Sequence, residues 1–99
     1  MNTELISKLQ KLYEDAANII MGSDKGFDSV NTISNGANIL VEHMDELKTY
    51  PSVYEVLTRC VYYVNKDFDE GTTFQDYVDM GDQLIEDISG YIGEFLEEL

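Results

Sequence analysis

Basic residues are scarce in this sequence, and its last third has none. Twenty Asp and Glu stand against six Lys and Arg, and residues 67–99 hold eleven of the acids and no base. Proteins that bind nucleic acid or anionic membranes directly need clustered Lys and Arg, so the charge excludes both classes. We expect instead a protein partner with a basic surface, which a strongly acidic chain meets quickly.

Cysteine and long apolar runs are also nearly absent. The single cysteine, Cys60, cannot form an internal disulfide, and no apolar run approaches the about 20 residues of a membrane span. The first residues lack a basic stretch followed by an apolar segment, so we predict no secretory signal and a cytoplasmic location. The hydrophobic fraction of 43% is that of a folded protein, and 99 residues suffice for a single domain, 1–99.

The first two apolar segments have helical spacing. Residues 3–21 are predicted to form a helix with Thr3 as its N-cap and with Gly22 as the left-handed residue after its end. Residues 28–47 keep the same three-four spacing, although they contain several poor helix formers. Asn35-Gly36 is also a favoured hairpin turn, so a hairpin stays open as the alternative to one continuous helix.

A third helix is predicted to start near Pro51. Ser52 and Glu55 have the spacing of a capping box, and proline suits a first helical turn. Its expected buried face is Val53, Leu57, Cys60, Val61 and Val64. The adjacent Tyr62 and Tyr63 point about 100° apart on a helix, so we expect at least one of them to leave the core.

The fourth helix has the clearest pattern and reaches the end of the chain. Thr72 and Gln75 form a candidate capping box, and apolar residues then recur every three or four positions. Apolar and acidic side chains fall on separate arcs of about 140° and 160°. The predicted fold is all-α, a compact antiparallel bundle of three to four helices with a long C-terminal helix.

The acidic arc is the candidate binding surface. Like charges three and four residues apart destabilise a helix, and a face meant only for solubility would normally include lysine. A solvated face that happens to be acidic remains the alternative interpretation. The candidate partner-binding residues are Asp76, Asp79, Asp82, Glu86, Asp87, Glu94, Glu97 and Glu98.

Other candidate sites are weaker. Residues 65–71 have oxygen ligands at alternate positions, but Gly71 comes one residue too late for an EF-hand. His43 and Glu46 are one helical turn apart, yet a two-metal bundle site needs a second histidine. Cys60 lies on an apolar face, where a buried thiol is unreactive. We therefore expect no catalytic residue, no metal, no cofactor and no enzymatic activity.

In size and charge the chain resembles the small acidic inhibitors of host nucleases, such as anti-restriction and anti-CRISPR nucleic-acid mimics, and nuclease immunity proteins. The resemblance implies an inhibitor that occupies the basic nucleic-acid-binding surface of a target protein. The alternative is an adaptor or structural module that self-associates through the apolar seam of the C-terminal helix, and the chain could be a monomer or a homodimer. That seam consists of Val78, Ile85, Ile88, Ile92 and Phe95.

Overall fold

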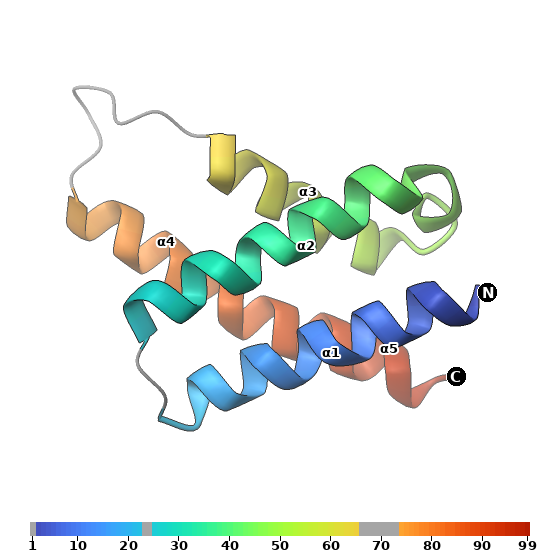
Figure 1. Ribbon diagram of the computed structural model, residues 1–99, viewed down its shortest axis with the longest axis horizontal. Coiled ribbons are helices and arrows are strands. Elements are labelled where there is room, and N and C mark those ends of the chain that lie inside the picture. Colours follow the sequence, from blue (N-terminus) through green and yellow to red (C-terminus); the bar gives the residue numbers. More distant parts are fainter. Residues whose placement is uncertain (1, 23–24, 66–73) are drawn as a thin grey trace.

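The computed structural model describes residues 2–22, 25–65 and 74–99. Within these residues the fold is all-α, with helices α1 (Thr3–Ile20), α2 (Lys25–Leu47) and α3 (Pro51–Asn65). The C-terminal helix consists of α4 (Phe74–Asp87), the π-helical turn η1 (Ile88–Ile92) and α5 (Gly93–Glu97), 24 residues in all. Successive long helices run in opposite directions, and the two ends of the chain lie at the same end of the bundle (Figure 1).

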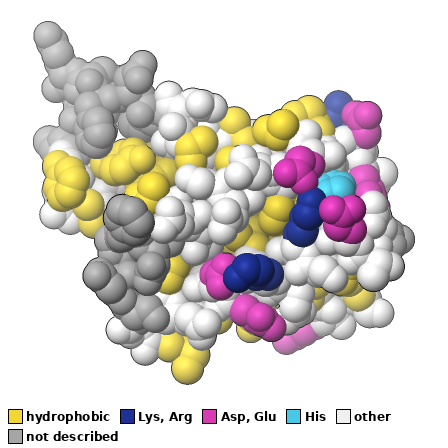
Figure 2. Space-filling model, viewed as in Figure 1, with side chains coloured by type: hydrophobic (Ala, Val, Ile, Leu, Met, Phe, Trp, Pro, Cys, Tyr) yellow, Lys and Arg dark blue, Asp and Glu magenta, His cyan; other side chains and the backbone are white. Residues whose placement is uncertain are grey.

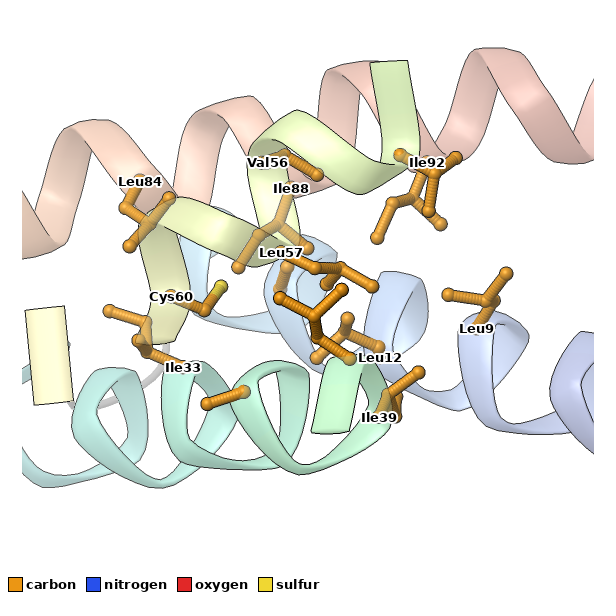
Figure 3. Close-up of a cluster of buried hydrophobic side chains, with 14 of the residues drawn as sticks. Leu9, Leu12, Ile33, Ile39, Val56, Leu57, Cys60, Leu84, Ile88 and Ile92 are labelled. Atoms are coloured by element: carbon orange, nitrogen blue, oxygen red, sulfur yellow. The ribbon is translucent and has the colours of Figure 1, made fainter. Parts of the chain in front are cut away.

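The bundle is compact and is built around one cluster of buried side chains. Its radius of gyration is 13.2 Å, close to the about 13 Å expected for a compact chain of this length. No helix of the described residues combines the length and the apolar character needed to cross a membrane. All four long helices supply the core, whose side chains converge in Figure 3: Leu9, Leu12, Ile33, Ile39, Val56, Leu57, Cys60, Leu84, Ile88 and Ile92.

The ends of α1 combine one confirmed prediction with one correction. Asn2, not Thr3, is the N-cap, because its Oδ1 accepts a hydrogen bond of 2.8 Å from the backbone N–H of Glu4. Thr3 is already helical. Gly22 follows the C-cap residue Met21 with a φ of +124°, as the left-handed position predicted for it requires.

The ambiguous second segment is one helical element, and the hairpin alternative is wrong. Asn35 is exposed, while Gly36 packs against α3, where a Cβ would lie 3.0 Å from Cys60 Sγ. The glycine therefore lets α2 and α3 approach closely, and tertiary packing outweighs the low helix propensity of this stretch. The helix is distorted near its end at His43, which has φ −128° and ψ 28°.

The third helix begins two residues earlier than a cap at Ser52 would require. Pro51 is its first residue, and the backbone N–H of Tyr54 donates to the Tyr50 carbonyl, which places Ser52 inside the first turn. The capping box proposed for Ser52 is thus wrong, whereas the position of the proline is confirmed. The buried face is also rotated from the expected one: it consists of Val53, Val56, Leu57, Cys60 and Tyr63, with Val61 half-buried and Val64 exposed.

Candidate protein-binding surface

The C-terminal helix exposes most of its acids to solvent. Of the eight predicted binding residues, only Asp87 is partly buried. The remaining seven, which we call the acidic face, are Asp76, Asp79, Asp82, Glu86, Glu94, Glu97 and Glu98.

Asp87 has an internal role. Its carboxylate lies 2.7 Å from Arg59 Nη1 of α3, and it also accepts a hydrogen bond of 3.1 Å from the Gln83 amide. The Asp87 side chain is 22% exposed, so this ion pair is partly shielded from water. Asp87 therefore connects α4 to α3 and is less available to a partner than the acidic face.

The acidic face has few neutralising neighbours. Among the described residues, no Lys or Arg forms an ion pair with Asp79, Asp82 or Glu86 of α4. The same holds for Glu94, Glu97 and Glu98 at the end of the helix. Asp79 accepts only a hydrogen bond of 2.9 Å from the Gln75 amide. The uneven charge of the sequence thus becomes a series of exposed acids along this helix.

The bases whose side chains the structure describes are already paired. Lys8 Nζ lies 2.5 Å from Glu42 and 3.3 Å from Glu4, and this pairing raises the pKa of Lys8 and lowers that of Glu42. The other ion pairs are Lys11–Asp15, Lys48–Asp45 and Arg59–Asp87. On the side of the molecule seen in Figure 2, basic side chains lie directly beside acidic ones, so the charge there is mixed.

The π-helical turn breaks the straight acidic arc that the sequence predicts. Hydrogen bonds in a π-helix reach one residue farther than in an α-helix, so the turn holds about one extra residue, or about 100° of rotation. Glu94, Glu97 and Glu98 are therefore rotated about the helix axis from the positions that an uninterrupted helix would give them. The turn also directs Gly93 at α1, where a Cβ would lie 2.7 Å from the Tyr13 ring.

Two tyrosines of α3 have opposite environments, as the sequence predicts. Tyr62 is 61% exposed, whereas Tyr63 is buried and stacks on Tyr77 with ring centroids 4.4 Å apart. Burial raises the pKa of the Tyr63 hydroxyl, which also hydrogen-bonds the Tyr77 carbonyl at 3.5 Å. Gly81 lies beneath this hydroxyl, so its lack of a side chain makes room for the ring pair.

The residues considered for metal binding and nucleophilic chemistry have other contacts. His43 Nε2 lies 3.3 Å from Lys8 Nζ, and Glu46 accepts a hydrogen bond of 2.9 Å from the Asn2 backbone. No group of three metal-ligating side chains occurs among residues 2–22, 25–65 and 74–99. Cys60 is buried, which raises its pKa to about 12 and leaves it as a neutral thiol. Of the calcium-like loop considered at residues 65–71, the structure describes only Asn65, which is the last residue of α3; residues 66–71 and the Thr72 cap lie outside the described residues.

The structure adds a partly apolar groove that the sequence pattern did not indicate. It lies between the start of α3 and the C-terminal helix, has a volume of about 580 Å³, and is bordered by Glu94 and Glu98. The exposed side chains of Tyr91 and Leu99 form part of its edge. By its spacing Tyr91 belongs to the apolar arc of the C-terminal helix, whereas the structure leaves its side chain 48% exposed.

Comparison with protein-family models, with characterised proteins and with solved structures finds no match.

Proposed function

We propose that this chain is a non-enzymatic inhibitor that places its acidic face in the basic nucleic-acid-binding groove of a target protein. The observation that carries the proposal is that six exposed acids of the C-terminal helix form no ion pair with a base of the described residues: Asp79, Asp82, Glu86, Glu94, Glu97 and Glu98. Every base with a described side chain is paired with another acid. An unpaired negative surface costs a helix stability, and a basic partner would offset that cost. Carboxylates one turn apart, about 5.4 Å, can replace the phosphates of a nucleic-acid backbone.

Burial argues against the adaptor alternative. Ile85, Ile88 and Ile92, which would form the self-association seam, are 2%, 0% and 0% exposed within one chain. A second copy could reach them only if the bundle opened. The formal net charge of −14 per chain also opposes self-association, because two copies would repel each other at low salt.

The proposal is tested by capturing partners on the immobilised full chain from a lysate of its native host. We expect a basic nucleic-acid-binding protein that is retained at low salt and released at high salt, because exposed charges are screened within about 10 Å at 0.1 M salt. Duplex DNA or structured RNA should release the same protein by competing for its groove. A partner that stays bound in the presence of excess nucleic acid would show that the acidic face does not occupy a nucleic-acid site.

A further inference from the structure

The groove between the start of α3 and the C-terminal helix is lined by three aromatic side chains, Tyr50, Tyr91 and Phe95. The rings of Tyr50 and Phe95 meet edge to face with centroids 5.1 Å apart, and Val53 is fully buried beneath. Tyr91 and Leu99 remain 48% and 64% exposed at the edge. The volume of about 580 Å³ lies within the range of small-ligand sites and exceeds that of any single amino-acid side chain.

The groove has an acidic border. Glu94 and Glu98 lie one helical turn apart on the same wall as Tyr91 and Phe95, and neither forms an ion pair with a base of the described residues. A second copy of this chain would bring more negative charge to this border. The surface is instead complementary to an apolar side chain that has Lys or Arg next to it.

The helix beside the groove has an unusual local structure. Tyr91 belongs to the π-helical turn, and such turns occur frequently at functional sites. Gly90 precedes it, and a Cβ at this position would have no atom within 4 Å, so internal packing does not require the glycine. Gly81 and Gly93, by contrast, lie against tyrosine rings. The open surface at Gly90 leaves room for a partner to approach Tyr91.

We propose that this groove binds an apolar anchor residue, carried by a basic segment of the protein that the acidic face engages. The anchor packs on Tyr50, Tyr91 and Phe95, and neighbouring Lys or Arg side chains pair with Glu94 and Glu98. This inference rests on the proposed function and adds to it a specificity element that general charge attraction lacks. Aromatic residues in such well-packed sites typically dominate the energy of an interface.

Two synthetic helical peptides of equal positive charge test the inference on the ¹⁵N-labelled full chain. One carries Trp and Leu one turn apart among lysines, and the other has Gln at both positions. We expect the Trp peptide to bind at least about tenfold more tightly, because burying a large apolar side chain contributes that much or more. Its largest chemical-shift changes should fall on Tyr91, Phe95 and Leu99.

Variants at exposed positions separate the groove from the acidic face. The double variant Tyr91→Ser and Leu99→Ser should remove the preference for the Trp peptide and leave binding of the Gln peptide unchanged. Val41→Ser, which changes an apolar residue on α2 that is at least as exposed as either, should leave the preference intact. Urea unfolding of each variant confirms that it folds.

Equal affinity for the two peptides, shifts centred elsewhere, or no binding of either peptide would overturn the groove proposal. The proposed function fails through a different result, namely a captured partner that nucleic acid does not displace. The two failures are thus distinguishable.

Discussion

Arg59 and Asp87 form an ion pair of 2.7 Å that connects α3 to the last residue of α4. The π-helical turn begins at the next residue, Ile88, so this contact holds the C-terminal helix just before its geometry changes. The Arg59 and Asp87 side chains are 41% and 22% exposed, which makes this contact less accessible to water than the Lys48–Asp45 pair. Asp87 is therefore expected to contribute to stability rather than to partner binding.

Replacing Asp87 by Asn should lower the free energy of unfolding by about 1 kcal/mol, the upper end of the range for exposed pairs. Lys48→Met removes a longer pair of 3.9 Å whose acid is fully exposed, and it should have no measurable effect. Urea unfolding followed by circular dichroism provides both values. Equal losses for Asp87→Asn and Lys48→Met would show that the α3–α4 pair has no special role.

The three glycines of the C-terminal helix should respond differently to alanine. Gly93→Ala places a Cβ 2.7 Å from the Tyr13 ring, so overpacking should cost about 1–3 kcal/mol. Gly90→Ala meets no neighbour and should raise stability by about 0.5–1 kcal/mol through helix propensity. Gly81→Ala, at 2.8 Å from the Tyr63 hydroxyl, should also destabilise. Thermal unfolding of the three variants checks the order, and a destabilised Gly90→Ala would contradict it.

Stability should fall at alkaline pH. Burial raises the pKa of Cys60 to about 12 and also raises that of Tyr63, so the unfolded chain loses these protons at lower pH than the folded chain does. Their contribution to the free energy of unfolding is complete below about pH 8.5, the pKa of a free thiol. It is lost as the pH rises through the pKa values that the two groups have in the folded chain. Urea unfolding at a series of pH values measures the decline. Cys60→Ala should make the decline shallower, and an unchanged slope would rule out a role for the thiol.

Repulsion within the acidic face should reduce stability at low salt. Asp82 lies three residues after Asp79 and four before Glu86, and no described base pairs with it. Asp82→Lys replaces two like-charge pairs by two opposite-charge pairs, which should raise stability by about 0.5–1 kcal/mol. The gain should shrink as salt is added, because screening weakens both kinds of pair. A gain independent of salt would point to a cause other than charge.

The sequence predicted the helices because apolar spacing reflects burial directly. Leu5, Leu9 and Leu12 are buried as their spacing requires, and the C-terminal acids are exposed as their arc predicts. In 28–47 the apolar spacing also predicted the helix correctly, although local propensity favoured a turn at Gly36. That conflict is resolved only by a contact with Cys60, a residue far along the chain.

The features that the sequence did not predict depend on how the helices meet. The π-helical turn coincides with the packing of Gly93 on Tyr13 of α1, which no local pattern in the C-terminal helix reveals. The pairing of Arg59 with Asp87 requires a particular register between α3 and α4. The partly apolar groove likewise exists only because the first turn of α3 faces the end of the C-terminal helix.

The central claim is that the acidic face of the C-terminal helix, and not negative charge in general, binds the target. It is tested most directly by comparing two charge-matched variants in the capture experiment. Asp79→Lys with Glu86→Lys changes the acidic face, and Glu14→Lys with Glu55→Lys makes the same change in net charge at exposed acids of α1 and α3.

Binding of the captured target to each variant is the measurement to make. We predict that the acidic-face variant loses affinity by about tenfold or more, since each reversed contact is worth on the order of 1 kcal/mol, while the α1–α3 variant binds nearly as the unmodified chain does. Equal losses in both variants, or none in either, would contradict the claim and leave the acidic face with a role in solubility alone.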